Sequence, residues 1–202
     1  MIGSRVGHRL DPLLVRIFRL LFGNAPIRPN VLTVIGLLFS LLTFFFTAVL
    51  GQLILAGIFL VVSGFFDLLD GAVARSTNMV TRFGGFLDSV LDRYSDLIVM
   101  FGISIYFLRR AEMLSSMVAF FAAIGVAIVP YARARAEAAS ITCRSGILER
   151  SERVILLSIG LLFHVLEPVI FVLAVLAQRF AVIAHQDNQR AVVHAALAQV
   201  IK

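Results

Sequence analysis

The chain has 202 residues, of which 60% are hydrophobic and 15% charged, and its mean hydropathy is +0.97. This composition is too apolar for a water-soluble domain and indicates an integral membrane protein. The formal net charge of +6 does not indicate nucleic-acid binding, because membrane proteins collect arginine at their cytoplasmic face.

The first predicted element is an amphipathic helix over residues 8–22. Arg9, Arg16 and Arg19 fall mostly off its apolar face. A helix of this kind lies in the interface of a bilayer. Residues 1–29 are therefore predicted to form a juxtamembrane helix and its linker. The apolar face consists of Leu13, Leu14, Ile17, Phe18, Leu21 and Phe22.

Six apolar segments follow, and we interpret each as a transmembrane helix. Gly51-Gln52 predicts a tight turn after the first segment, and Glu167-Pro168 predicts a turn between the last two. We expect one all-α membrane domain over residues 1–202, with six transmembrane helices in 31–184 and a polar tail in 185–202. The segments cover about residues 31–50, 53–73, 83–107, 113–136, 153–166 and 169–184.

Basic residues gather at both ends of the chain and in the connections after the second and fourth segments. In a six-span chain these four regions share one side of the membrane. Arg109 and Arg110 are the contrary pair, and Glu112 beside them offsets part of their charge. The positive-inside rule therefore places both termini, and the connections after the second and fourth segments, on the cytoplasmic side of the cell membrane.

Four aspartates occupy the facing ends of the second and third segments. Asp67 and Asp70 are spaced i,i+3, and Asp88 and Asp92 are spaced i,i+4, so each pair projects from one helix face. One ionised carboxylate at bilayer depth costs roughly 2.5–3.5 kcal/mol. A divalent cation such as Mg²⁺ or Mn²⁺ would offset that cost, since hard ions prefer carboxylate oxygens and bind substrate phosphates. The site is predicted near headgroup depth in the cytoplasmic leaflet.

The spacing around these aspartates reads D-x-x-D-G-x-x-A-R, eight residues, then G-x-x-x-D-x-x-x-D. It resembles the signature of the CDP-alcohol phosphatidyltransferases. The resemblance implies that the four aspartates hold two metal ions, with Asp92 also acting as the general base, and it suggests a homodimer. The donor implied is a CDP-linked lipid such as CDP-diacylglycerol. The metal ligands are Asp67, Asp70, Asp88 and Asp92.

The same resemblance assigns a binding site for the cytidine nucleotide. Asn30 and Thr33, in the segment PNVLT, match a recurrent element that faces the nucleotide, although a plain helix cap would also explain them. The glycines allow close approach of a ligand or of a neighbouring helix. The expected set is Asn30, Thr33, Asp67, Asp70, Gly71, Ala74, Arg75 and Gly84.

Arginines near the ends of the last three predicted helices suit bidentate recognition of a phosphate, although positive-inside topology would also place them there. The segment YARARAE and the later E-R-S-E-R resemble the phosphatidylinositol phosphate synthase branch, which implies inositol phosphate as the acceptor. Two positions depart from that branch: Arg133 replaces a lysine and Ser151 replaces a proline. The implied acceptor ligands are Arg133, Arg153 and Arg179.

Several alternatives stay open at this point. Glycerol 3-phosphate or serine could be the acceptor in the same reaction. A cation channel or carrier would explain acidic residues inside the membrane, although it would not explain Gly71, Ala74 and Arg75 within the motif. Asp96 continues the stripe of Asp88 and Asp92 but lies outside the signature, and we expect it to pair with a buried arginine.

Overall fold

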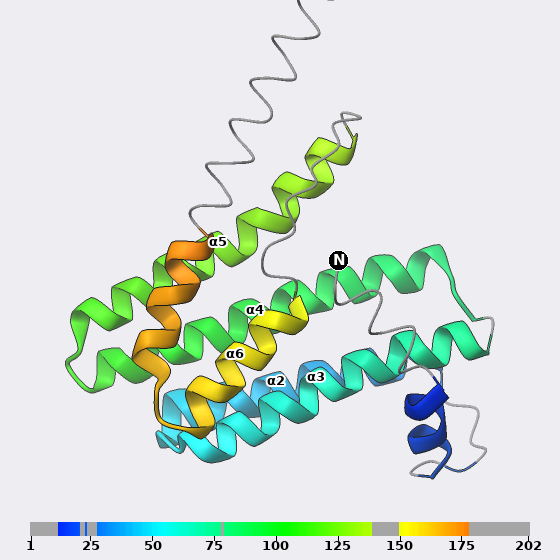
Figure 1. The fold of residues 1–202 in the computed structure, drawn as a ribbon, viewed down its shortest axis with the longest axis horizontal. Coiled ribbons are helices and arrows are strands. Elements are labelled where there is room, and N and C mark those ends of the chain that lie inside the picture. The colour runs from blue at the N-terminus through cyan, green and yellow to red at the C-terminus, as the bar shows by residue number, and fades with distance from the viewer. Residues whose placement is uncertain (1–11, 21–22, 24–27, 78, 139–149, 178–202) are drawn as a thin grey trace, which may run out of the picture.

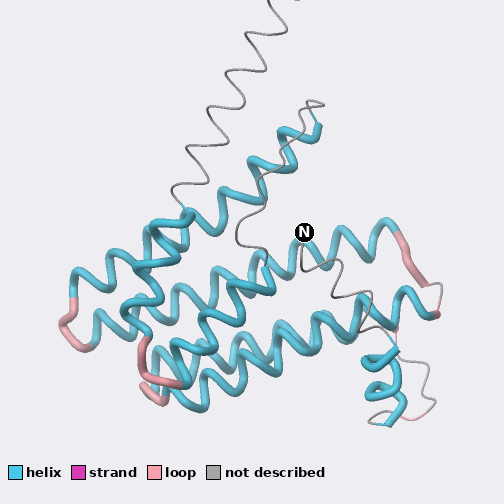
Figure 2. Tube along the Cα trace, in the orientation of Figure 1, coloured by secondary structure: helices cyan, strands magenta, loops and turns pink. Residues whose placement is uncertain are grey.

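The computed structural model describes residues 12–20, 23, 28–77, 79–138 and 150–177. Within those ranges every regular element is a helix, as the sequence predicted (Figure 2). A short helix over 12–20 precedes α2 (Pro29–Phe44), which continues into the π-helical segment η1 (Phe45–Leu50). The other helices are α3 (Leu53–Ser76), α4 (Arg82–Arg109), α5 (Met113–Ala138), α6 (Arg150–Leu162) and a helix over Leu166–Ala177.

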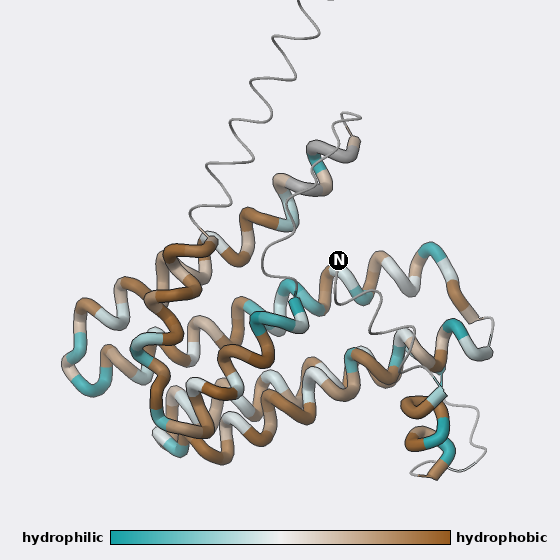
Figure 3. Tube along the Cα trace, in the orientation of Figure 1, coloured by the Kyte–Doolittle hydropathy of each residue, from teal (hydrophilic) through white to brown (hydrophobic). Residues whose placement is uncertain are grey.

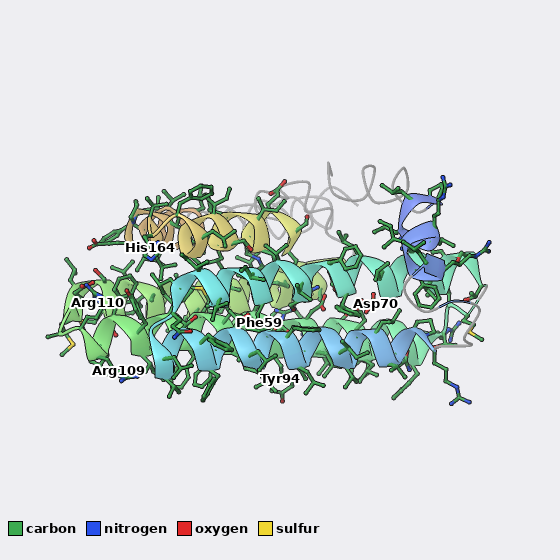
Figure 4. All side chains as sticks on the ribbon, turned by 90° about the horizontal axis from the view of Figure 1, so that it is seen from below. Phe59, Asp70, Tyr94, Arg109, Arg110 and His164 are labelled. Carbon is green, nitrogen blue, oxygen red and sulfur yellow. The ribbon has the colours of Figure 1, made fainter. Side chains whose placement is uncertain are left out.

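The long helices pack beside one another in a bundle. Helix α2 contacts both α3 and α4, and α4 contacts α5 (Figure 1). Helix α6 lies against α3, on the side away from α2 (Figure 4). The main core joins α3, α4, α5, α6 and the last helix, and its fully buried large side chains include Met100, Ile103, Leu161, Ile170 and Leu173.

Helices α2 and α3 are also joined by buried hydroxyl groups. The Ser63 hydroxyl donates to the carbonyl of Gly36 over 2.8 Å, and the Ser40 and Ser63 hydroxyl oxygens lie 2.8 Å apart. Because a bilayer core supplies no water, polar groups inside a membrane protein must find partners within the protein. These bonds hold α2 close to the helix that carries Asp67 and Asp70.

The predicted turn at Gly51-Gln52 is confirmed. Gly51 has φ of 67°, a left-handed conformation that glycine adopts without strain, and it ends η1. The Arg109 guanidinium, at the end of α4, donates to the carbonyl of Ala48 over 2.6 Å and also to that of Val49. A cation therefore satisfies carbonyls at the C-terminal end of η1.

All six predicted segments coincide with described helices, in whole or in part. By length and composition, three helices in the described residues could cross a membrane: Pro29–Leu50, Leu53–Ser76 and Met113–Ala132. Helix α4 is longer than any of these but carries Asp88, Asp92, Arg93 and Asp96. Many large apolar side chains are exposed, and this suits contact with lipid. Figure 3 shows that hydrophobic residues, in brown, occur along all the long helices. The protein is an integral membrane protein, and the number of crossings stays a prediction.

One predicted boundary is wrong. The sequence placed the turn between the last two helices at Glu167-Pro168, but α6 ends at Leu162 and the next helix begins at Leu166. Pro168 fits in the first helical turn, where its missing N–H would have no partner in any case. The chain reverses instead near His164, whose φ is 58°. Helix α6 also begins at Arg150, three residues before the predicted start.

The helix over 12–20 packs on the protein as well as facing outward. Leu14 and Phe18 are buried in a second core cluster formed with Leu32, Leu69, Ala72 and Val73. Leu13 and Leu20 remain exposed, so an interfacial position for this helix stays a prediction. The proposed division into residues 1–29, 31–184 and 185–202 also stays a prediction, because much of both end segments lies outside the described residues.

Candidate active site between helices α3, α4 and α6

Three of the four predicted metal ligands meet at one point. Oxygen atoms of Asp67 and Asp70 on α3 and of Asp88 on α4 lie within 4.8 Å of one another. Asp70 is buried, and the other two are partly buried. The buried oxygens Asp70 Oδ2 and Asp88 Oδ1 have no hydrogen-bond partner among the described residues. Clustered anionic oxygens without donors fit a hard divalent cation.

Asp92 lies beside this group and contacts an arginine. Its Oδ1 is 3.0 Å from Nη1 of Arg150, which also pairs with Asp67, and Arg150 Nε lies 3.8 Å from Asp96 Oδ1. One guanidinium therefore connects α6 with a carboxylate of α3 and two of α4. Figure 3 shows the polar segments of α4 beside the first turn of α6.

Sequence reasoning did not assign a role to Arg150. A signal was available, because Arg150 and Arg153 in E-R-S-E-R are spaced i,i+3 and share a helix face. The motif alone does not show which acidic residues that face would meet. The expected partner of Asp96 is confirmed: Arg153 Nη2 lies 2.8 Å from Asp96 Oδ2, and both side chains are largely buried.

A pocket of about 410 Å³ adjoins the aspartates, between the start of α2, the end of α3 and the start of α4. Seven of the eight residues predicted for the nucleotide line it, and Asp67 is the exception. The seven are Asn30, Thr33, Asp70, Gly71, Ala74, Arg75 and Gly84. Asp88 and Thr81 line the same pocket. The structure thus brings the predicted residues together, and their binding of CDP remains a proposal.

The position of Asn30 does not support the helix-cap alternative. Helix α2 begins at Pro29, its N-cap position is Arg28, and the Arg28 side chain makes no capping hydrogen bond. Thr33 donates back to the carbonyl of Pro29 over 3.3 Å, within the helix, and its hydroxyl contacts the carboxylate of Asp70. Both residues are therefore oriented towards the pocket rather than needed to start the helix.

Gly84 is required by the local packing at the start of α4. A Cβ atom there would lie 2.9 Å from Thr81 Oγ1 and 3.2 Å from Asn30 Oδ1. Thr81 is the N-cap of α4 and accepts a hydrogen bond from the Gly84 N–H over 2.9 Å. The first turn of α4 thus faces the pocket, and a helix N-terminus favours phosphate groups.

Of the three predicted acceptor ligands, only the side chain of Arg153 is described. Arg133 belongs to α5, but its side chain lies outside the described residues, as does all of Arg179. Arg153 is buried, and besides pairing with Asp96 it donates to the carbonyl of Val126 over 3.4 Å.

Curated relatives and solved structures resemble this chain over most of its length. The archaetidylinositol phosphate synthase of Pyrococcus horikoshii is 42% identical over 86% of the chain and 89% of its own length. The phosphatidylinositol phosphate synthase of Mycobacteroides abscessus is 32% identical over 69% and 64%.

The crystal structure of the Mycobacterium tuberculosis phosphatidylinositol phosphate synthase with CDP-DAG bound is 25% identical. It superposes with a TM-score of 0.73 over 91% of this chain and 93% of that chain. A second crystal structure of that protein, with manganese and citrate, gives a TM-score of 0.72. Residues 26–194 match the family described as CDP-alcohol phosphatidyltransferase. The chain therefore belongs to the CDP-alcohol phosphatidyltransferase family.

Proposed function

We propose that this enzyme transfers a phosphatidyl group, or the equivalent group of a related lipid, from a CDP-linked lipid to inositol phosphate and releases CMP. The observation that carries the proposal is the meeting of Asp67, Asp70 and Asp88 beside a pocket lined by the nucleotide residues. The names of its relatives support inositol phosphate as the acceptor. Family membership makes the chain a transferase of phospholipid biosynthesis, so the channel or carrier alternative is wrong.

We propose that Asp67, Asp70 and Asp88, with Asp92, hold two Mg²⁺ or Mn²⁺ ions. The manganese bound in a structural relative supports a divalent cation. When bound, such ions polarise the phosphorus under attack and stabilise the departing phosphate. The protein's own contribution is to hold the carboxylates together on α3 and α4 before the substrate binds. The charges that act on the pyrophosphate are then preorganised.

In the proposed reaction, Asp92 takes the proton of the acceptor hydroxyl. The hydroxyl oxygen then bonds to the phosphorus of the lipid phosphate, the bond from that phosphorus to the CMP oxygen breaks, and CMP leaves. Asp92 suits this role because it stands beside the metal group, and Arg150 Nη1 fixes its orientation from 3.0 Å. Nucleotide binding is assigned to the pocket set, in which Arg75 can meet a phosphate and Gly71 and Gly84 leave room beside the backbone.

We propose that Arg153 binds the phosphate of the acceptor together with Arg133 and Arg179. Arg153 is held by Asp96 and by the carbonyl of Val126, which leaves its rotamer restricted before any ligand arrives. The proposal also places the site and both termini on the cytoplasmic side, and two copies of the chain in a dimer. Exposed apolar surfaces beside the site would keep the lipid chains in the bilayer while the pyrophosphate reaches the pocket.

An acceptor panel tests this function. Purified protein, CDP-diacylglycerol and Mg²⁺ are combined with inositol phosphate, glycerol 3-phosphate or serine, and CMP release is measured. We expect release with inositol phosphate, none without Mg²⁺, and little with the other two alcohols. Release with glycerol 3-phosphate or serine alone would replace the proposed acceptor and leave the reaction class intact. A parallel series with a CDP-linked ether lipid shows which lipid the enzyme prefers.

A further inference from the structure

Helix α5 contains Pro130 well inside its bounds. Proline has no backbone N–H, so the carbonyl four residues earlier, that of Val126, loses its helical donor. The proline ring also crowds this same carbonyl. An unpaired carbonyl buried among helices costs free energy, and a donor from elsewhere normally satisfies it.

Two arginines from other helices donate to carbonyls of this turn, and one of them reaches the Val126 carbonyl. Arg153 Nη1 of α6 donates to the carbonyl of Val126 over 3.4 Å, and Arg93 Nη1 of α4 donates to that of Ala127 over 2.7 Å. Arg153 uses a second nitrogen, Nη2, to reach Asp96 on α4 at 2.8 Å. Its guanidinium is thus held from two directions, by a carbonyl of α5 and by a carboxylate of α4.

We propose that Pro130 is a positioning residue for the acceptor site. By removing one helical hydrogen bond, it leaves the Val126 carbonyl available to orient Arg153, and Arg153 meets the acceptor phosphate. This inference rests on the proposed function, because it needs the role of Arg153 given there. An arginine side chain loses rotamer entropy when it is fixed. Fixing it in the free enzyme removes that cost from acceptor binding.

The test is Pro130→Ala, assayed with inositol phosphate and CDP-lipid varied separately. The substitution restores a backbone N–H at position 130, which donates to the Val126 carbonyl within α5. Arg153 then loses its hydrogen bond to that carbonyl. The acceptor KM should rise roughly 2- to 10-fold, with the KM for the CDP-lipid unchanged. Pro130→Ser restores the same N–H and should reproduce the effect. Ile128→Ala, on the exposed side of the same turn, is the matched control and should leave both KM values unchanged.

A double-mutant cycle separates positioning from general damage to the helix. Arg153→Ala alone should raise the acceptor KM roughly 10- to 100-fold, and adding Pro130→Ala to it should change that KM little further. Equal effects of Pro130→Ala with and without Arg153 would overturn the inference. So would an unchanged acceptor KM in Pro130→Ala, or an effect confined to the serine variant. Failure of the unmodified enzyme to use inositol phosphate would instead overturn the proposed function.

Discussion

In the C-terminal half of α4, the Ser104 hydroxyl donates to the Ser116 carbonyl over 3.1 Å, and the Ser116 hydroxyl donates to the Ser104 carbonyl over 2.9 Å. In the N-terminal half, Asp88 Oδ1 is buried without a donor among the described residues. We call the region around Ser104 and Ser116 the closed end. It also includes the hydrogen bonds from Arg109 to carbonyls of η1 and from Ser115 to Glu167. The second region, around Asp67, Asp70, Asp88 and Asp92, is the site end.

The difference separates groups that hold the fold from groups that we propose hold ligands. The two regions lie at opposite ends of the bundle, with Asp70 near one end and Arg109 and His164 near the other (Figure 4). Polar groups of the closed end pair with one another, which stabilises helices in a medium without water. At the site end, the carboxylates of Asp67, Asp70 and Asp88 are held close together, an arrangement that costs stability and indicates function.

The largest expected effect comes from Asp70→Asn. An amide keeps the shape of the side chain but removes one anionic ligand from the metal group, so CMP release should fall below detection even at saturating Mg²⁺. Asp67→Asn and Asp88→Asn should behave alike. Thermal unfolding of Asp70→Asn measured without Mg²⁺ should show no loss of stability, since the change relieves repulsion between carboxylates, whereas Asp67→Asn also removes an ion-pair partner of Arg150. Near-normal turnover in any of the three would refute the metal assignment.

A smaller effect is expected from Arg150→Met, which keeps the apolar stem and removes the cation shared by Asp67 and Asp92. Asp92 would lose its ion-pair partner and with it its orientation, and kcat should fall up to about 100-fold, or about 3 kcal/mol in activation free energy. Steady-state rates at saturating substrates measure the change. Arg150→Lys should recover part of the rate, and a variant with unchanged kcat would show that Arg150 is not part of the machinery.

Gly84→Ala should weaken binding of the CDP-lipid and leave binding of the acceptor unchanged. The added Cβ lies within 3.2 Å of Asn30 Oδ1 and 2.9 Å of Thr81 Oγ1, so both must shift away from the pocket. We expect the KM for the CDP-lipid to rise roughly 3- to 10-fold, or about 1 kcal/mol, with the acceptor KM unchanged. Gly85→Ala is the matched comparison, because Gly85 lines the same pocket but a Cβ there meets nothing within 4 Å among the described residues. Similar KM changes in both variants would mean that helix propensity, not crowding, causes the effect.

The smallest effect on catalysis is expected at the closed end. Ser115→Ala removes the 2.8 Å hydrogen bond to Glu167 Oε1 and should lower the free energy of unfolding by about 1–2 kcal/mol. Turnover per folded molecule and both KM values should stay the same. Unfolding in detergent and kinetics on the same preparation measure the two quantities. A changed acceptor KM would show that the two ends are coupled.

The sequence was sufficient for most of the helices and for the placing of each aspartate pair on one helix face, because both depend on local spacing. Asp67 and Asp70 share a helix face by i,i+3 periodicity, and an apolar run specifies a helix wherever it lies in the chain. The pocket residues followed from the motif, and seven of the eight line one cavity.

Contacts between distant segments could not be predicted in the same way. Arg150 meets Asp67 from a helix far along the chain, and no spacing rule connects them. A role for Pro130 could be inferred only from the arginine hydrogen bonds to the preceding turn, which the sequence does not show. The misplaced turn near Pro168 has a local cause, since a proline that ends one helix and a proline in the first turn of the next look alike in sequence.

The packing of the helix over 12–20 affects how the enzyme should be purified and assayed. Leu14 and Phe18 rest on Leu69, Ala72 and Val73, which flank Asp70 and Gly71 in the chain. A short-chain detergent that competes for Leu14 and Phe18 would remove the support behind the nucleotide pocket while the long helices stay associated. Activity would then disappear from a preparation that still elutes as one sharp peak, and extraction into lipid nanodiscs or mild long-chain detergents is the condition under which the enzyme should be assayed.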